Sequence, residues 1–269
     1  MIDRRPIGVF DSGIGGLTVA RAINDLLPNE SILYFGDTAH LPYGEKSPEL
    51  IRRYSSHITQ HLVESGCKAI VVACNSASSN AIEAIVKAAG PKVPVIDMVT
   101  PVVRSISAED GCKSVGLIGT RATISSGLYH ETIKQLNSKI TLVSRATPLL
   151  ASAIEEGFFN DSIPGAVLEA YFADNNFDHI DCMILGCTHY PLVREEVQAL
   201  LSKGVKVIDS PKIIAQELKR VLTENTNSST PDHQFQVSDL TDNFKFSAHH
   251  FFGSDVNLEE VSFSYQDQG

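Results

Sequence analysis

Two cysteines occupy similar places in the sequence, each at the end of an apolar run and just before polar residues. Cys74 ends the run in VVACNSASSN (71–80), and Cys187 ends the run in MILGCTHYP (183–191). A thiolate can accept a proton, and a thiol can return one. A single free cysteine is more often a small buried hydrophobic residue than a reactive one. The matched pair reverses that expectation, and we interpret the two thiols as acting on one bound molecule.

The remaining cysteines and the composition are typical of an ordinary globular protein. Cys67, Cys112 and Cys182 lie outside the matched pattern, and we expect them to be buried core residues. The cysteine count of five is odd, and MIDRRPIGVF at the N-terminus lacks the apolar core of a signal peptide. We therefore predict reduced thiols, no disulfide framework and a cytoplasmic location. The net charge of −10 disfavours nucleic acid and anionic membranes as partners, and no apolar run could cross a bilayer.

Short apolar runs alternate with amphipathic segments in the N-terminal part of the chain. The pattern predicts strands at 6–12, 31–37, 68–74 and 93–98, and helices at 17–27, 47–66 and 78–90. The longest of these helices has Ser47 as its N-cap, Pro48 in its first turn and Gly66 beyond its end. Such alternation predicts an α/β fold, with parallel sheets covered by helices on both faces.

The same pattern then recurs, which indicates a duplicated unit. SVGLIGT (114–120) resembles PIGVFDS (6–12), CMILGCTH (182–189) resembles IVVACNS (70–76), and VKVIDS (205–210) resembles VPVIDM (93–98). Matching residues are 108, 113 and 112 positions apart: Gly8 and Gly116, Cys74 and Cys187, Asp97 and Asp209. We predict two similar parallel-sheet α/β domains related by a pseudo-two-fold axis. Residues 1–98 with 210–269 form the first, discontinuous domain, and residues 99–209 form the second.

The C-terminal segment is expected to complete the first domain. The sequence predicts a helix at 211–222, a polar loop at 225–233, a strand at 234–240 and a helix at 242–253. Ligands of open α/β sheets bind beyond the carboxyl ends of the strands, where both matched cysteines lie. Amide groups at the start of a following helix could lower the pKa of either thiol. Two facing domains would place one thiol on each side of a ligand, an arrangement suited to inversion at a carbon that carries hydrogen.

Other constellations carry less information. DSGIGGLT (11–18) does not match G-x-G-x-x-G, because Thr18 occupies the third glycine position, and it lacks the lysine of a P-loop. It is either a tight turn or a set of backbone amides that, with Asp11 and Ser12, faces a polar ligand. Cys187 and His189 lack the CxxC or HxxxH spacing of a zinc site, so we expect no bound metal.

Four segments together resemble the bacterial glutamate racemases, of the aspartate/glutamate racemase superfamily. They are VFDSGIGGLTV, LPYGEKS, VVACNSAS and LGCTHYP, and the resemblance extends from about residue 7 to residue 253. Ser76 stands where many members have threonine, which keeps the hydroxyl. The resemblance implies a racemase that interconverts L- and D-glutamate without a cofactor. It also implies a role in peptidoglycan synthesis, and thus in cell wall biogenesis and cell shape.

The resemblance also assigns roles to residues. Cys74 and Cys187 match the two acid/base residues, Asp11 and His189 match residues that assist them, and Glu155 matches a third, with the adjacent Glu156 as the alternative. The positions that match substrate contacts are Asp11, Ser12, Tyr43, Gly44, Asn75, Ser76, Thr188 and His189.

Other functions remain open from the sequence. A cysteine hydrolase would use Cys187 and His189 as nucleophile and base, and would leave the second matched thiol unexplained. An amino-acid-binding module would need no catalytic thiol, and a racemase acting on aspartate would share the paired cysteines. The sequence leaves the assembly undecided, with a homodimer as one candidate.

Overall fold

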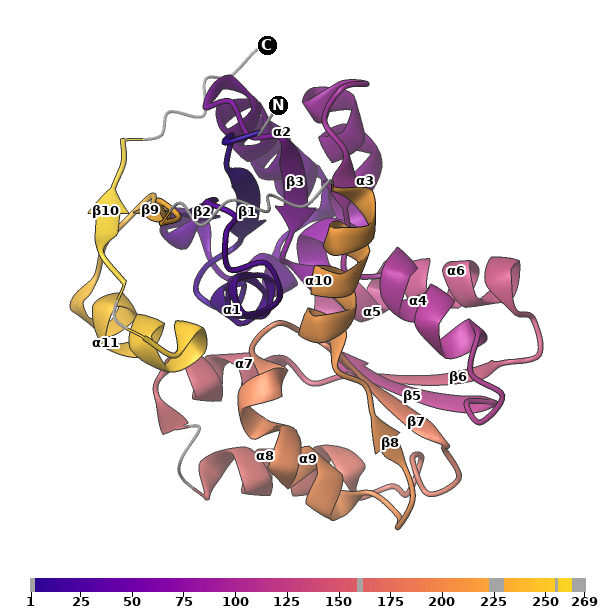
Figure 1. The fold of residues 1–269 in the computed structure, drawn as a ribbon. Helices are drawn as coiled ribbons and strands as arrows, with labels where there is room; N and C mark the ends of the chain where they lie inside the picture. The colour runs from indigo at the N-terminus through magenta and orange to yellow at the C-terminus, as the bar shows by residue number, and fades with distance from the viewer. Residues whose placement is uncertain (1–2, 159–161, 223–229, 255, 263–269) are drawn as a thin grey trace.

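Two parallel β-sheets organise the chain in the computed structural model, which describes residues 3–158, 162–222, 230–254 and 256–262 (Figure 1). In the described chain the first sheet has the strand order β10-β9-β2-β1-β3-β4 and the second has the order β6-β5-β7-β8. The first comprises β1 (Ile7–Asp11), β2 (Ile32–Gly36), β3 (Ala69–Val72), β4 (Val95–Ile96), β9 (Gln234–Val237) and β10 (Leu258–Glu260). The second comprises β5 (Ser114–Gly119), β6 (Thr141–Ala146), β7 (Cys182–Gly186) and β8 (Lys206–Val207). The predicted α/β class with parallel sheets is confirmed.

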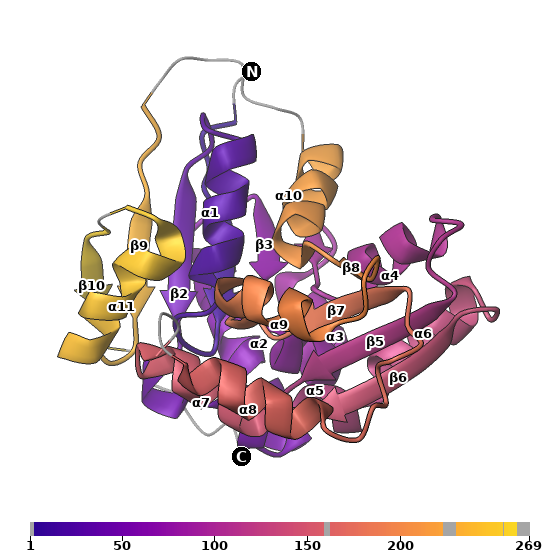
Figure 2. The ribbon, with the colours of Figure 1, turned by 90° about the horizontal axis from the view of Figure 1, so that it is seen from below.

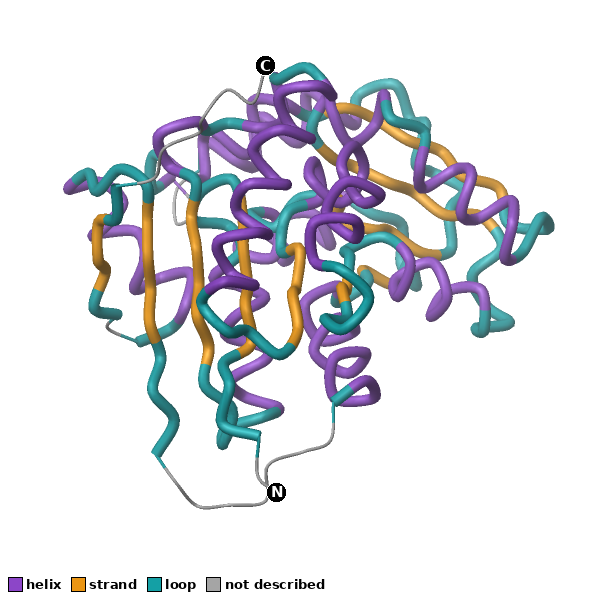
Figure 3. The backbone as a smooth tube through the Cα atoms, turned by 90° about the horizontal axis from the view of Figure 1, so that it is seen from above, coloured by secondary structure: helices purple, strands orange, loops and turns teal. Residues whose placement is uncertain are grey.

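The two sheets repeat one strand order. The order β2-β1-β3-β4 in the first corresponds to β6-β5-β7-β8 in the second, strand by strand along the chain. This correspondence is what a duplicated unit predicts, and it places Cys74 and Cys187 after equivalent strands, β3 and β7. Figure 3 shows the strands of the two sheets set obliquely to each other.

Helices cover both faces of the first sheet. Side chains of β1 alternate between two apolar clusters: Ile7 and Val9 pack with α1 (Leu17–Leu26), and Phe10 packs with α2 (Pro48–Glu64) and α3 (Asn75–Ala89). β1, β2 and β3 are buried at every position, because helices cover them on both faces. This burial explains why their side chains are mostly apolar and do not alternate with polar ones. Two more helices pack against α1: α10 (Ser210–Val221), beside it in Figure 2, and α11 (Asp242–Phe252).

Shorter helices surround the second sheet. They are α4 (Thr100–Ser107), α5 (Arg121–Ser125), α6 (Leu128–Leu136), α7 (Pro148–Glu155), α8 (Ile163–Phe172) and α9 (Arg194–Leu200). In the part of the chain that the structure describes, 3₁₀ segments lie in loops of the two units: η1 (Thr38–His40), η2 (Tyr43–Glu45) and η4 (Tyr190–Val193). Among the described residues, no helix combines the length and the apolar character needed to cross a membrane.

Most predicted elements agree with the structure, although their ends differ. The Ser47 side chain accepts a hydrogen bond from the Leu50 N–H, and Pro48 begins α2, as expected. The helix predicted at 78–90 instead begins at Asn75, so that Cys74 is its N-cap residue. Part of the predicted polar loop at 225–233, residues 223–229, lies outside the described residues.

The C-terminal part of the chain adds strands to the edge of the first sheet. β9 pairs with β2 in parallel, and β10, which the sequence did not predict, pairs with β9. α11 ends at Gly253, which adopts a positive φ of 88°. The exact domain boundaries, at 98/99 and 209/210, remain a prediction.

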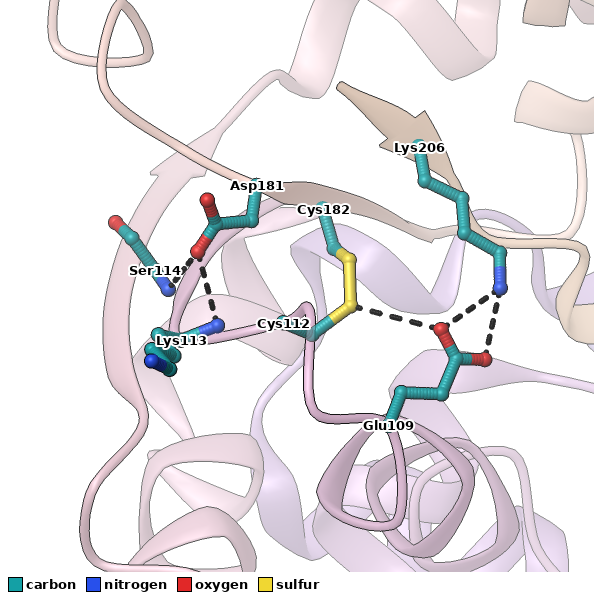
Figure 4. Close-up of a disulfide and its surroundings, with 7 residues drawn as sticks. All are labelled: Glu109, Cys112, Lys113, Ser114, Asp181, Cys182 and Lys206. Carbon is teal, nitrogen blue, oxygen red and sulfur yellow. Dashed lines mark hydrogen bonds and ion pairs between the residues drawn. A yellow bond between two sulfur atoms is a disulfide. The ribbon is translucent and has the colours of Figure 1, made fainter. Parts of the chain in front are cut away.

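The expectation that all five thiols are free is wrong for one pair. Cys112 and Cys182 form a disulfide (Figure 4), whereas Cys67, Cys74 and Cys187 are free and buried. Cys182 begins β7 and Cys112 precedes β5, and the pairing of these two strands brings the Cα atoms to 5.6 Å, within the range that a disulfide spans. The Asp181 carboxylate holds the same loop by accepting the backbone N–H groups of Lys113 and Ser114. This disulfide lies at the amino ends of the strands, opposite the ends that carry Cys74 and Cys187.

Candidate active site

A narrow cleft with a volume of about 50 Å³ lies between residues that follow the strands of both sheets. All eleven residues that the sequence proposed for the site line it: Asp11, Ser12, Tyr43, Gly44, Cys74, Asn75, Ser76, Glu155, Cys187, Thr188 and His189. Glu156 instead lines a neighbouring cavity, so the location favours Glu155. The structure thus brings these residues together in one cleft. Their roles in catalysis and binding remain predictions.

Cys74 lies at the start of α3 and is only 4% exposed. Its Sγ is 3.7 Å from Ser12 Oγ. Burial raises the pKa of the Cys74 thiol, and the nearby charge of Asp11 raises it further. The backbone N–H groups of Ala77 and Ser12 act in the opposite direction but are outweighed. The expected lowering of this pKa by the helix start is therefore wrong, because desolvation dominates.

Asp11 ends β1 and directs its carboxylate into the same region. Its Oδ2 accepts hydrogen bonds from the N–H groups of Gly13 (3.2 Å) and Gly16 (2.9 Å), so the glycine-rich turn wraps around this carboxylate. Oδ1 is buried and has no hydrogen-bond partner among the described residues. Burial raises the pKa of Asp11, although the charge of His189 and the Gly16 N–H favour the carboxylate. The Asp11 carboxyl group thus has one oxygen free to interact with a ligand.

Cys187 has a different set of neighbours. His189 Nδ1 lies 3.5 Å from Cys187 Sγ, and His189 Nε2 lies 2.8 Å from Glu155 Oε1. Burial alone lowers the pKa of His189, but the charges of Glu155 and Cys187 outweigh it, so the pKa lies well above its usual value. The raised pKa favours the imidazolium form of His189, which has one N–H for each neighbour.

The structure also corrects the expected helix after Cys187. The residues after Cys187 form a short 3₁₀ segment, Tyr190–Val193, and the α-helix begins only at Arg194. The positive group nearest this thiol is thus the His189 side chain and not a helix N-terminus. The edge-to-face contact between His189 and Phe251 of α11, with ring centroids 5.4 Å apart, fixes the plane of the imidazole.

Comparison with known proteins identifies the family. Residues 7–218 match the family model described as Asp/Glu/Hydantoin racemase. The chain belongs to the Asp/Glu/hydantoin racemase family. It is therefore an enzyme of the isomerase class, and the cleft between the two sheets is its candidate active site.

Individual relatives cover nearly the whole chain. A glutamate racemase of Chlorobium phaeobacteroides is 40% identical over 95% of this chain and 96% of its own length, and one of Geobacter metallireducens is 38% identical over 93% of each. A crystal structure of glutamate racemase from Francisella tularensis in complex with D-glutamate matches with a TM-score of 0.91 at 37% identity, covering 98% of this chain and 100% of that one. The glutamate racemase of Thermus thermophilus in complex with beta-chloro-D-alanine matches with a TM-score of 0.87 at 37% identity, covering 98% of this chain and 99% of that one.

The sequence did not identify Thr120, a hydroxyl-bearing residue of the cleft in this racemase fold. Thr120 lines the cleft, and its Oγ1 lies 2.9 Å from Ser76 Oγ and 3.0 Å from Thr123 Oγ1. Thr120 follows β5 just as Ser12 follows β1, so the repeat in the sequence could have identified Thr120 as a residue of the cleft. The Thr120 hydroxyl therefore adds a neutral donor from the second unit to the cleft.

The charges around the cleft constrain what it can bind. Among the described residues that line it, His189 is the only cation, and Asp11, Glu45 and Glu155 are carboxylates. An acidic ligand must therefore be held by neutral donors, which the hydroxyl and amide side chains supply. The described residues contain no cluster of three His, Cys, Asp or Glu side chains arranged to hold a metal ion.

Proposed function

We propose that the chain is a glutamate racemase that interconverts L- and D-glutamate by two proton transfers, one at each thiol, without a cofactor. The observation that carries this proposal is that Cys74 and Cys187 line one cleft from equivalent strand ends of the two units. The glutamate racemases among its relatives, one of them solved with D-glutamate, support the substrate.

The two thiols differ in a way that suits this reaction. The raised pKa of Cys74 keeps it a protonated thiol, ready to give a proton. Protonated His189 can donate to the sulfur of Cys187, so we assign Cys187 as the base that removes the Cα proton of L-glutamate. In that direction Cys187 removes the Cα proton, the C–H electron pair stays on the substrate, and Cys74 delivers a proton to the opposite face. D-glutamate then reacts through the same steps in reverse, with Cys74 as the base.

The weak acidity of the Cα proton is the main barrier to be lowered. The negative charge that develops on the substrate needs preorganised donors around it. We propose that Asn75, Ser76 and Thr188 supply them, because all three line the cleft and lie within two residues of a thiol. We assign the other substrate contacts to Ser12, Tyr43, Gly44 and the free oxygen of Asp11, which could accept from the substrate ammonium group.

Isotope exchange tests the two-thiol mechanism directly. With L-glutamate in D₂O, the first D-glutamate formed should carry deuterium at Cα, while the recovered L-glutamate keeps its protium. The variants Cys74→Ala and Cys187→Ala should each lose racemisation in both directions by about 10⁴-fold or more, at the upper end for an acid–base group. Early deuterium in the recovered L-substrate would indicate a single base and contradict the proposal.

The same assay separates the competing functions. A binding module would produce no change in optical rotation with L-glutamate, and a cysteine hydrolase would form an acyl-enzyme visible by mass spectrometry. Faster turnover of L-aspartate than of L-glutamate would reassign the substrate.

For the cell, we propose that the enzyme acts in the cytoplasm and supplies D-glutamate for peptidoglycan, and thereby supports cell wall biogenesis and cell shape. Its gene should then rescue a bacterial strain that requires added D-glutamate, whereas the Cys74→Ala variant should not. A homodimer stays a candidate assembly, which light scattering of the purified protein decides.

A further inference from the structure

The side-chain amide of Asn75 has two polar atoms in different surroundings. Its Oδ1 accepts a hydrogen bond from the hydroxyl of Tyr129 at 2.8 Å. Its Nδ2 is buried and has no hydrogen-bond partner among the described residues. Asn75 is 3% exposed and lines the cleft, so this unpartnered amino group lies where a ligand can reach it.

Tyr129 approaches Asn75 from the other unit. Asn75 is the first residue of α3, beside the first sheet, whereas Tyr129 lies on α6, beside the second. Tyr129 is 2% exposed and does not line the cleft, so it reaches the substrate only through Asn75. The hydrogen bond therefore connects the two units directly behind a predicted substrate contact.

Resting on the proposed function, we infer that Tyr129 is a positioning residue, which fixes the Asn75 amide so that its N–H₂ group faces a carboxylate of glutamate. The terminal torsion of asparagine is broad and nearly two-fold, so without a partner the amide can turn its oxygen toward the ligand. An oxygen in that place repels a carboxylate, whereas an N–H binds it. A phenol that keeps its proton is a donor for Oδ1.

The surroundings of Tyr129 keep that proton in place. Burial raises the pKa of the Tyr129 hydroxyl, and the charges of Asp97 and Cys187 raise it further. The hydroxyl therefore stays neutral across the working pH range and can donate to Oδ1. A merely structural hydrogen bond would stabilise the fold but would not distinguish between the two orientations of the amide.

A double-mutant cycle tests this role. Tyr129→Phe removes only the hydroxyl, and we expect kcat/KM for glutamate to fall about tenfold, mostly through KM, as for one misdirected hydrogen bond to a charged group. In an Asn75→Ala background the same change should cost less than about twofold, because the amide it orients is gone. Tyr190→Phe is the matched control: it removes another buried hydroxyl, bonded to Thr147 at 2.8 Å, and neither of these residues lines the cleft.

The outcomes separate this inference from the proposed function. Equal losses from Tyr129→Phe in both backgrounds, or wild-type kinetics in the single variant, would overturn the positioning role while racemisation stands. If the wild-type protein binds glutamate without racemising it, the proposed function fails, and the same cycle in dissociation constants from calorimetry still decides the role of Tyr129. If glutamate does not bind the wild-type protein at all, both ideas are wrong.

Discussion

Gly15 lies where the structure has no space for a side chain, and replacing it gives a quantitative test of the site geometry. A Cβ atom at Gly15 would lie 2.4 Å from Thr188 Oγ1 and 2.5 Å from His189 Nδ1, whereas ordinary van der Waals contacts begin at 3.4 Å. Both residues are 4% exposed, so neither side chain can move away freely. In Gly15→Ala they must shift by about 1 Å, and a displacement of that size in an active site costs about a hundredfold in rate.

The expected result is a fall of about a hundredfold in kcat/KM in both directions, with most of the loss in kcat, because His189 moves relative to the Cys187 sulfur. Circular dichroism follows the conversion of each enantiomer, and thermal unfolding checks that the variant is folded. Gly13→Ala is the control from the same turn: its Cβ would meet Glu155 Oε1 and Leu41 Cδ2 at 3.6 Å, which are ordinary contacts. Near-normal activity of Gly15→Ala, or an equal loss in Gly13→Ala, would refute the reasoning.

Three further results are expected. Glu155→Gln removes the charge that raises the pKa of His189, so the alkaline limb of kcat/KM for L-glutamate should move to lower pH, whereas Glu156→Gln should leave it in place. Thiol titration of the unfolded protein should find three free thiols before reduction and five after it. Loss of the disulfide, whose cysteines are 70 residues apart, should lower the free energy of unfolding by up to about 4 kcal/mol. Burial raises the pKa of Cys67 to about 12, so above about pH 8.5 the unfolded chain loses a proton from this thiol that the folded chain keeps. Cys67 should therefore contribute a fall in stability of about 1.4 kcal/mol per pH unit, and Cys67→Ala should make the slope in urea titrations shallower by that amount while the contribution of buried Cys74 remains.

Much of the fold followed from local patterns in the sequence. Buried strands next to amphipathic helices gave the parallel α/β class, and Ser47 and Pro48 marked the start of α2 because capping depends only on neighbouring residues. The matched strand ends placed Cys74 and Cys187 at one cleft, because equivalent strands of a repeated unit end in equivalent places. β10 was missed because its short segment is stabilised by pairing with β9 and not by its own composition.

Properties that depend on distant parts of the chain could not be predicted. The disulfide requires Cys112 and Cys182 to meet through the pairing of β5 with β7. The direction of the Cys74 pKa shift depends on how completely the cleft removes it from water, and the sequence could show only the helix start that acts the other way. Tyr129 offered no sequence signal, because its partner lies 54 residues away in the other unit.

The duplication explains how two thiols at equivalent strand ends come to have different surroundings. A reaction that takes a proton from one face and returns one to the other needs one thiolate and one thiol at the start. If the two cysteines had identical surroundings, neither would be favoured as the thiolate. Where β1 ends in Asp11, the corresponding position of β5 is Gly119, and the Asp11 carboxylate raises the pKa of Cys74.

The second difference between the two thiols lies in the residues that come after each cysteine in the sequence. Two residues after Cys187 stands His189, held as an imidazolium by Glu155, whereas two residues after Cys74 stands Ser76, which cannot carry a charge. The carboxylate thus acts on one side of the cleft and the imidazolium on the other. In the proposed two-thiol mechanism both proton transfers run in either direction, so these differences bear only on which thiol starts as the base. Under that mechanism we expect Cys187 to be the base for L-glutamate and Cys74 to be the base for D-glutamate.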